Sequence, residues 1–381
     1  MRPICARVVA DADKLNAINK SRSMMMIRHV AEINCPGNPF RGHQIGAIGL
    51  ADLCGIIRQS KSLVTVNLND NEIGSKGAST IAEAMKQSRS MTNMNLSWNS
   101  ICDVGASALA EAIAQSKSLT TVKLRGNLIG GVGATAIAEA IKQNNSLATL
   151  DLWNNDIGDA GAFDLAEAIK QSSSLTAVNL GYTQLGADGA LAIAEAIRKS
   201  HSLTTVILGG NEFGAEGASA IAEAIKQSRS LTTVNLSYTR LGADSAVVIA
   251  EVIRKSHSLT VVNLSYTQLG ADGALAIAEA IKQSSSLVAM TLNNNEIGEK
   301  GAFAIAEAIA QSKSLAMVDL SSNAIGANGA RAIAEAIKQS KSITSVDLSA
   351  NSIGAACAAA IADTIKQSKP LVRIDVTNNH Y

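Results

Sequence analysis

The sequence predicts an α/β solenoid, in which a short strand and a helix alternate along one elongated chain. Three observations predict it: an aliphatic anchor every 28 residues, an Asn or Thr eight residues after most anchors, and a following segment rich in Ala, Ile, Glu and Lys. The anchors are Leu63, Met91, Leu119, Leu147, Leu175, Leu203, Leu231, Leu259, Leu287, Leu315, Ile343 and Leu371. Such self-similarity indicates one supersecondary unit that buries its apolar face only against copies of itself.

Each unit begins with a strand. In the unit that starts near Ser118, the apolar residues Leu119, Val122, Leu124 and Ile129 are separated by small or polar residues. This alternation predicts a short strand whose apolar side chains point into the core.

A polar residue follows the strand. Asn tolerates turn conformations and can bond backbone groups that a strand end leaves unpaired, so its repetition predicts a ladder of side-chain amides. The Asn members are Asn71, Asn99, Asn127, Asn155, Asn211, Asn295, Asn323, Asn351 and Asn379. Thr183, Thr239 and Thr267 take this place in three units, with a weaker version of the same bonds, and His43 takes it in an early degenerate unit.

A glycine pair and a helix complete the unit. Gly130 and Gly133 allow a tight turn and a close approach between neighbouring units. Residues 134–143 predict a helix with an apolar side at helical spacing. Glu and Lys three residues apart are expected to pair on its outer surface. These pairs are Glu83 and Lys86, Glu139 and Lys142, Glu167 and Lys170, Glu223 and Lys226, Glu279 and Lys282, and Glu335 and Lys338.

The start of the chain departs from the period. Residues 1–34 predict an N-terminal cap, with a helix over Val8–Lys20, or alternatively the remnant of a longer upstream region. Residues 35–62 predict a degenerate repeat in which Pro36 and Pro39 interrupt the strand, because proline cannot donate to a ladder.

Residues 63–381 predict the regular solenoid of 28-residue units. The sequence stops at Tyr381, so Leu371, Ile374 and Val376 would form a partly uncovered terminal layer, unless the chain is a fragment. A bare terminal layer would be a place for self-association.

The repeat resembles the leucine-rich repeat of the ribonuclease-inhibitor class, in its L-x-x-V-x-L-x-x-N-x-I-G-x-x-G-A wording followed by A-x-x-I-A-E-A-I-K-Q. This resemblance covers about residues 35–381 and implies a horseshoe with parallel strands on the concave face and helices on the convex face. It also implies a non-catalytic scaffold that binds a macromolecular partner, similar to the repeat regions of NOD-like receptors in sensing or regulation. The alternative is a GTPase activator resembling the Ran GTPase activator.

The chain departs from each of these relatives. It has no phosphate loop of a complete receptor, it is neither cysteine-rich nor strongly acidic like ribonuclease inhibitor, and no acidic tail ends it. A GTPase activator of this type contributes to catalysis through loops at the strand ends, and no loop here breaks the 28-residue length.

Composition limits the class of partner. The 381 residues carry a formal charge of +1, so we expect neither nucleic acid nor an anionic membrane as partner, but a protein. Five cysteines without metal-ligand spacing favour a reducing compartment, the cytoplasm or the nucleus.

The informative residues are those that differ between units and point off the strands. The series four residues after each anchor is Asn67, Asn95, Lys123, Asp151, Asn179, Ile207, Asn235, Asn263, Thr291, Asp319, Asp347 and Asp375. Because parallel strands lie about 4.8 Å apart, the last three predict an acidic column, tempered by Arg373.

The aromatic residues indicate where a partner would bind. Exposed Trp and Tyr beside charges are typical of binding hot spots. The predicted partner-binding residues are Trp98, Lys123, Arg125, Asp151, Trp153, Asp156, Tyr182, Tyr238, Tyr266, Asp319 and Asp347. The first seven come from four successive units and could form one patch. The other interpretation is that the rings pack along the rim against one another, Tyr238 on Tyr266 especially.

No catalytic residue, cofactor or metal is expected. The five histidines are scattered without companion ligands, and no G-K-[ST] follows the glycines at Gly130–Gly133. The sequence therefore does not predict an enzyme.

Overall fold

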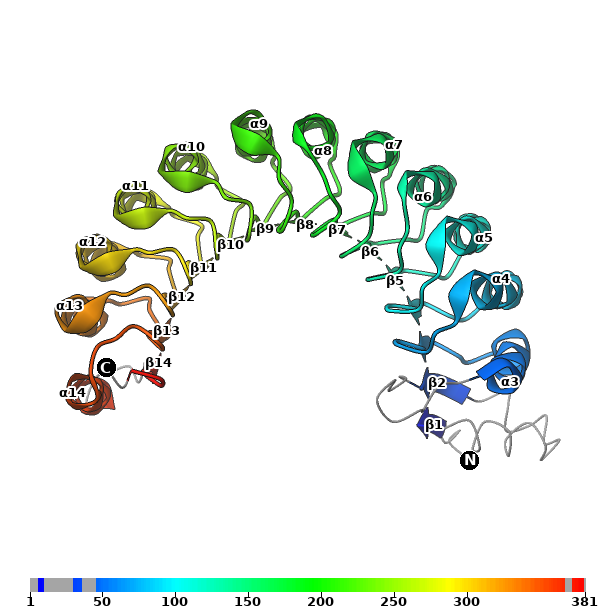
Figure 1. Ribbon diagram of the computed structural model, residues 1–381, viewed down its shortest axis with the longest axis horizontal. Helices are drawn as coiled ribbons and strands as arrows, with labels where there is room; N and C mark the ends of the chain where they lie inside the picture. The colour runs from blue at the N-terminus through cyan, green and yellow to red at the C-terminus, as the bar shows by residue number, and fades with distance from the viewer. Residues whose placement is uncertain (1–5, 10–29, 36–45, 367–371, 380–381) are drawn as a thin grey trace. The chain divides into compact units, whose positions relative to one another are not determined.

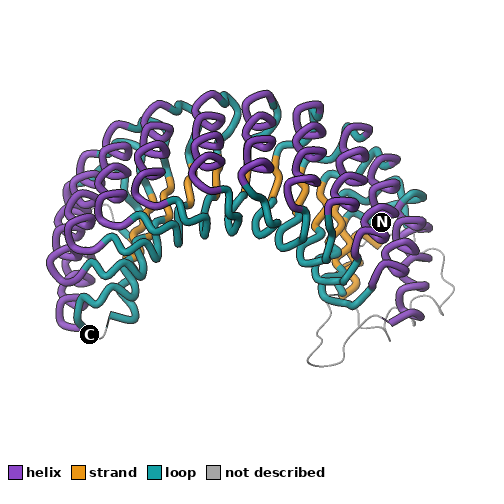
Figure 2. The backbone as a smooth tube through the Cα atoms, turned by 45° about the horizontal axis from the view of Figure 1, so that its top comes forward, coloured by secondary structure: helices purple, strands orange, loops and turns teal. Residues whose placement is uncertain are grey.

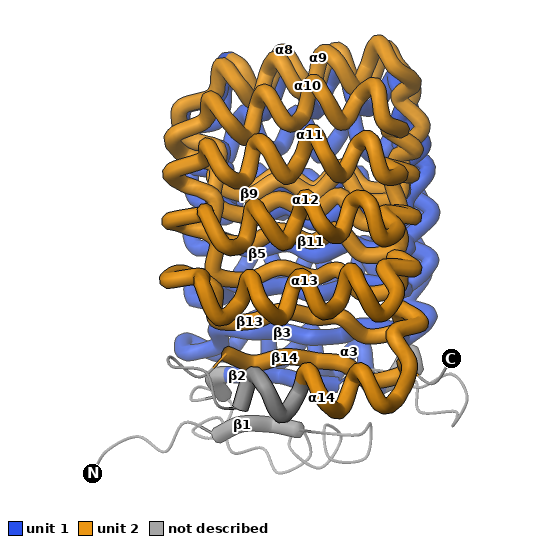
Figure 3. Tube along the Cα trace, turned by 90° about the vertical axis from the view of Figure 1, so that its left-hand side faces the viewer, with its two compact units in different colours: residues 1–185, 199–203 blue, residues 186–198, 204–381 orange. Residues whose placement is uncertain are grey.

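The computed structural model describes residues 6–9, 30–35, 46–366 and 372–379. The described residues form alternating short strands and helices (Figure 1). They divide into two compact units, residues 1–185 with 199–203 and residues 186–198 with 204–381 (Figure 3). Each unit is described by itself.

Unit 1 holds the first strands and helices. These are β1 (Ala6–Val9), β2 (Val30–Asn34), α3 (Gly46–Gln59), β3 (Thr65–Asn67), α4 (Gly74–Met85), β4 (Asn93–Asn95), α5 (Cys102–Gln115), β5 (Thr121–Lys123), α6 (Gly131–Gln143), β6 (Thr149–Asp151), α7 (Gly158–Gln171) and β7 (Ala177–Asn179). Their strands pair in parallel and in chain order. From β3 onward each strand residue pairs with the residue 28 positions later in the next strand, so Val122 lies between Met94 and Leu150.

Unit 2 repeats the pattern. Its elements are α8 (Ala187–Lys199, the last residue belonging to unit 1), β8 (Thr205–Ile207), α9 (Gly214–Gln227), β9 (Thr233–Asn235), α10 (Gly242–Lys255), β10 (Val261–Asn263), α11 (Gly270–Gln283), β11 (Ala289–Thr291), α12 (Gly298–Gln311), β12 (Met317–Asp319), α13 (Gly326–Gln339), β13 (Ser345–Asp347), α14 (Ala355–Lys366) and β14 (Arg373–Asp375). The strands again pair in parallel, each with the next along the chain.

Within each unit the helices cover one side of the strands and leave the other side open (Figure 2). Helices need about 8–10 Å between axes, whereas paired strands need only about 4.8 Å. Stacked repeats must therefore curve with the strands on the inner side, as both units do. This confirms the predicted α/β solenoid of strand–helix repeats, with strands on one face and helices on the other.

The core is a stack of aliphatic layers between the strands and the helices. In the repeat of β5 and α6, Leu119, Leu124 and Ile137 are all fully buried, as the strand and helix patterns predict. All six predicted Glu–Lys pairs form on the helices, for example Glu139 with Lys142 at 2.6 Å. They lie on the solvent side and contribute little stability.

The predicted asparagine ladder is present, and it joins neighbouring repeats. Asn127 Nδ2 donates to the carbonyl of Leu96 in the preceding repeat at 2.9 Å. Its Oδ1 accepts the N–H of Asn99, also in the preceding repeat, at 2.9 Å. At the threonine positions the hydroxyl donates within its own repeat, as Thr239 does to Leu236 at 2.5 Å. Threonine thus supplies the local bond, as predicted, and it lacks the amide that reaches the preceding repeat.

The two glycines at the start of α7 have separate roles. Gly158 has φ +60° at the turn into α7, a backbone conformation that costs glycine little. At Gly161 a Cβ would lie 2.8 Å from the Cβ of Ala134 in the preceding helix. The second glycine therefore allows the close approach of neighbouring helices that the sequence predicts.

The first repeat is longer than 28 residues. Ile33 in β2 pairs with Val66 in β3, an offset of 33, whereas α3 keeps the offset of 28 from α4. Five additional residues therefore lie between β2 and α3. His43, expected at the ladder position of this repeat, lies outside the described residues, as do Pro36 and Pro39.

The expected helix over Val8–Lys20 is wrong at its start, because Val8 and Val9 belong to strand β1, which pairs with β2. Residues 10–20 lie outside the described residues. Valine is β-branched and favours a pleated, half-buried position, a preference that outweighs the helical pattern here.

At the other end of the chain, the last strand is less covered than the strands before it. Ile374 and Val376 are half-buried, whereas the equivalent Val346 and Leu348 of the preceding repeat are fully buried. Leu371 lies outside the described residues. Self-association through this layer stays a prediction.

Candidate functional site

The strand ends are shaped by one recurring turn. The side-chain oxygen of the residue four places after the anchor, the fourth-place residue, accepts the N–H two residues later. The N–H donors are those of Asn69, Ser97, Trp153, Gly181, Ser237, Ser265, Ser321, Ser349 and Thr377. Asn and Asp both make such turns, so either residue satisfies the backbone here.

The residue directly after the N–H donor of the turn lies in the left-handed region. Trp98 has φ 58°, Tyr182 52°, Tyr238 59° and Tyr266 56°, and Gly126 takes the same place with φ 58°. For a residue other than glycine this conformation costs about 1–2 kcal/mol. It holds all four aromatic side chains at the rim of the strand face, where each is more than a third exposed.

Three rings of unit 1 are in contact. The ring centroids of Trp98 and Trp153 lie 5.9 Å apart at an interplanar angle of 67°, and those of Trp153 and Tyr182 lie 5.3 Å apart at 65°. Trp98 reaches Trp153 across an intervening repeat. Gly126 permits this, because a Cβ at that position would collide with the Trp98 ring.

Charged groups border these rings. Arg125 Nε bonds Asp151 Oδ2 at 2.5 Å, and its guanidinium lies 5.8 Å from the centroid of the Trp153 ring. The side chain of Asp151 is only 9% exposed, so the carboxylate of this ion pair is largely buried. We call Trp98, Arg125, Asp151, Trp153 and Tyr182 the aromatic rim patch.

The structure therefore assembles most of the predicted patch. Asp156 extends it, since its Oδ1 accepts a bond of 2.5 Å from Gln184 Nε2, two residues after Tyr182. Lys123 lies beside Asp151 on the neighbouring strand, with its side chain exposed. The sequence reasoning did not identify Gly126 and Gln184 as part of the patch. Gly126 could have been found, because a glycine there takes the place that Trp98 occupies one repeat earlier and leaves room for a large ring.

The other two predicted tyrosines belong to unit 2 and form a pair of their own. The rings of Tyr238 and Tyr266 stack with centroids 4.2 Å apart and an interplanar angle of 12°. This is the packing along the rim that the sequence offered as the alternative interpretation. Each ring covers part of the other, so less apolar surface remains for a partner.

The acidic column is also present in unit 2. Asp319 pairs in register with Asp347, and Asp347 with Asp375. Each carboxylate accepts the N–H of its own turn, at 2.8–2.9 Å. The bond from Thr377, with a smaller contribution from Arg373, holds the pKa of Asp375 below its ordinary value. The turn explains an Asx residue at these positions, and it does not explain the choice of Asp over Asn.

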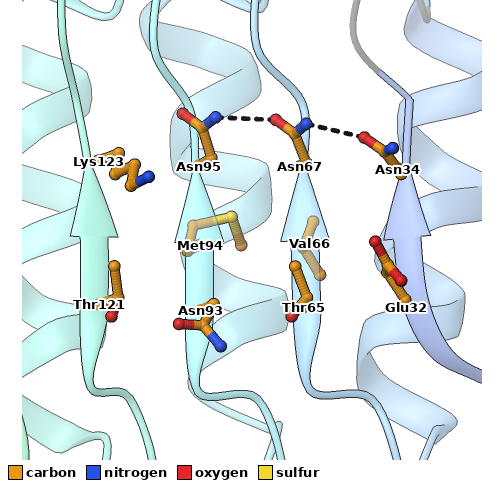
Figure 4. A pocket seen from close by; sticks show the side chains of 10 residues that line it. All are labelled: Glu32, Asn34, Thr65, Val66, Asn67, Asn93, Met94, Asn95, Thr121 and Lys123. Atoms are coloured by element: carbon orange, nitrogen blue, oxygen red, sulfur yellow. Dashed lines mark hydrogen bonds between the residues drawn. The ribbon is translucent and has the colours of Figure 1, made fainter. Parts of the chain in front are cut away.

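A polar hollow of about 310 Å³ lies on the strand face of unit 1 (Figure 4). We call it the strand-face hollow; its lining is Glu32, Asn34, Thr65, Val66, Asn67, Asn93, Met94, Asn95, Thr121 and Lys123. Three side chains in it, Asn34, Asn67 and Asn95, form a hydrogen-bonded amide row. Asn95 Nδ2 donates to Asn67 Oδ1 at 2.9 Å, and Asn67 Nδ2 donates to Asn34 Oδ1 at 2.8 Å. The longer first repeat concealed Asn34 from the sequence reasoning.

The glycines at Gly130–Gly133 do not form a phosphate loop. Asp103 Oδ1 accepts the N–H of Gly130 at 2.7 Å and that of Gly133 at 2.9 Å. A carboxylate of the preceding repeat thus already occupies the donors that a phosphate would need.

The described part of the chain holds no group of three or more His, Cys, Asp or Glu placed to bind a metal ion, and its four cysteines are free thiols. Of its helices, none combines the length and the apolarity that a membrane span requires.

The geometry defines a class of protein: a repeat solenoid with buried polar ladders and an open strand face whose side chains vary. The family model described as Leucine Rich repeat matches nine stretches that together exceed half of the chain: residues 59–82, 87–110, 115–138, 143–166, 171–194, 199–222, 227–250, 255–278 and 311–334. The chain therefore belongs to the leucine-rich repeat family.

Comparison with other proteins supports the fold alone. No curated protein matches the sequence. A protein in the crystal structure of the Rad7 and Elc1 complex in yeast is 11% identical, with 95% of this chain and 86% of that chain covered and a TM-score of 0.58. Leiomodin-1 Actin-Binding Site 2 is 21% identical over 38% of this chain and 84% of that chain; its TM-score of 0.34 carries no argument.

Proposed function

We propose that this chain is a non-catalytic scaffold that binds a protein partner on the strand face and rim of unit 1, with the aromatic rim patch as the anchor. The observation that supports this most is the contact of Trp98, Trp153 and Tyr182, which come from three different repeats. The free thiols favour the cytoplasm or the nucleus as the place where it acts.

The patch has the properties of a binding hot spot. Trp, Tyr and Arg are enriched in hot spots because they bury a large area at a small cost in side-chain entropy. The left-handed backbone at Trp98 and Tyr182 recurs at the same place in the other repeats, for example at Ser322 and Ala350, so it is a property of the repeat turn that holds both rings at the rim, where they meet Trp153.

Packing between the rings alone is a weaker explanation of the patch. Edge-to-face ring pairs contribute only about 0.5–1.5 kcal/mol each. At the same time Trp98 remains 43% exposed and Tyr182 37%. Rings that served only to stabilise the fold would contribute more stability if they were more deeply buried. Their exposed area therefore favours a role in binding a partner.

The test is affinity capture from native cells with the wild type and with Trp98→Ala plus Trp153→Ala. We expect the double variant to lose the captured partner while its circular dichroism and melting curve stay almost unchanged. The matched control is Phe163→Ala, an equally exposed ring on helix α7 of the same unit. Capture by the double variant at the wild-type level, or its unfolding, would contradict the proposal.

A further inference from the structure

The amide row of the strand-face hollow has a fixed direction. Asn95 Oδ1 accepts the backbone N–H of Ser97 at 3.1 Å, and Asn67 Oδ1 accepts that of Asn69 at 3.3 Å. A backbone N–H can only donate, so both oxygens must face their turns and both NH₂ groups must face the neighbouring strand. Figure 4 shows the resulting chain of bonds from Asn95 through Asn67 to Asn34.

This direction uses the acceptors of the row and leaves donors. Asn67 Oδ1 and Asn95 Oδ1 each accept two hydrogen bonds within the fold. Each of their NH₂ groups has two hydrogens and donates one to the row. Among the described residues, the second hydrogen of each group, both hydrogens of Asn34 Nδ2 and the ammonium of Lys123 have no acceptor. The hollow is therefore rich in unused donors.

The charges along the row also have a direction. Lys123 stands at one end, where its nearest acidic neighbour in register, Asp151, is already bonded to Arg125. Glu32 stands at the other end, next to Thr65 in register. An acceptor-rich ligand is thus favoured from Lys123 to Asn67, and Glu32 disfavours an anion beyond that point.

We propose that the strand-face hollow binds an acidic segment of the partner protein, whose Asp or Glu carboxylates accept from Asn67, Asn95 and Lys123. This rests on the proposed function, which it deepens by naming the chemistry of the partner. A carboxylate accepts up to four hydrogen bonds and donates none, which complements a row of donors about 4.8 Å apart. Bonds between amide donors and a charged acceptor are also stronger than neutral ones.

The chain itself shows which substitution isolates this chemistry. In unit 2 the fourth-place residues Asp319 and Asp347 make the same turn with a carboxylate. Asn67→Asp plus Asn95→Asp therefore keeps both turns and replaces the exposed donors by acceptors. The matched control is Asn235→Asp plus Asn263→Asp, the same exchange at two turns of unit 2.

The experiment is fluorescence anisotropy of a labelled oligoglutamate peptide with the full chain, beside an oligoglutamine peptide of the same length. We expect the wild type to prefer oligoglutamate, with weaker binding as salt rises. Asn67→Asp plus Asn95→Asp should weaken binding about tenfold or more, and so should Lys123→Gln, which changes only an exposed residue. The control pair should stay within about twofold.

Three results would overturn the inference: no preference for oligoglutamate, wild-type affinity in the first pair and in Lys123→Gln, or an equal loss in the control pair. Binding of a single-stranded oligonucleotide as tight as that of oligoglutamate would overturn it as well, because the site would then select charge alone. If the wild type captures a partner that the double tryptophan variant loses, but does not bind oligoglutamate, the proposed function stands and only this inference is refuted.

Discussion

Replacing Asn127 by Ala tests how much one rung of the ladder contributes. The side chain is fully buried and makes four hydrogen bonds. It donates to the carbonyls of Leu96 at 2.9 Å and Arg125 at 3.1 Å, and it accepts the N–H groups of Asn99 at 2.9 Å and Ile101 at 3.4 Å. Alanine removes all four bonds and fills none of the space.

The magnitude follows from which partners keep another bond. The Leu96 carbonyl retains Asn99 Nδ2 at 3.0 Å, so it stays satisfied. The N–H of Asn99 is buried and loses the acceptor at 2.9 Å. One buried unsatisfied donor costs about 1–3 kcal/mol and each net bond about 1 kcal/mol, so we expect Asn127→Ala to lower the free energy of unfolding by about 3–5 kcal/mol.

Asn127→Thr is the graded comparison. Thr183, Thr239 and Thr267 show that a hydroxyl at this place donates to the carbonyl three residues earlier, so a threonine at position 127 can replace part of the lost bonding. We therefore expect about half the loss of the alanine variant. Urea denaturation followed by circular dichroism gives both values, and hydrogen exchange at the Asn99 amide locates the change. A loss below about 1 kcal/mol for alanine, or equal losses for both variants, would refute the reasoning.

Three further predictions concern the core, the patch and the outer surface. Leu124→Asp should destabilise the chain by about 3–5 kcal/mol in urea denaturation, because it buries an unpaired charge at a fully buried position. Gly126→Ala should displace the Trp98 ring and weaken partner capture, which a shift in tryptophan fluorescence would report. Hydrogen bonds from Arg254, and then from the lysine after it, lower the pKa of Glu251 to about 2 from 4.5. Since folding lowers this pKa, the stabilisation is present above pH 4.5 and is lost as pH falls through about 2, and an NMR titration of the carboxyl should show that midpoint.

The sequence predicted the fold well because one pattern recurs many times. Each copy states the same strand, polar rung, glycine turn and helix, so a weak local signal becomes a strong one. The prediction failed at the start of the chain, where the sequence does not recur in other repeats. β1 carries a helical pattern at Val8 and pairs as a strand, and the five additional residues after β2 moved the first unit out of the expected phase.

The candidate site was predictable in its residues and less so in its contacts. The exposed place of Trp98, Tyr182 and the acidic column follows from counting along the repeat. The contact between Trp98 and Trp153 depends on side-chain rotamers and on the space above Gly126, which a period of 28 does not encode. The sequence therefore predicts which residues face outward, and the structure shows which of them are in contact.

Two asparagine series, four residues apart, show how this chain separates folding from recognition. Asn127 uses its oxygen and its NH₂ group for buried backbone of the preceding repeat, so neither end is free to vary. Asn95 uses its oxygen for the turn at Ser97 and presents its NH₂ group on the open face. Asp319, the fourth-place residue of a repeat in unit 2, accepts the N–H of its turn equally well and presents a carboxylate oxygen instead of an NH₂ group. Exchange between Asn and Asp is therefore costly in the ladder and cheap on the strand face, where a single atom per repeat changes the surface from donor to acceptor. A solenoid built in this way can alter what it binds while every turn and every rung stays intact.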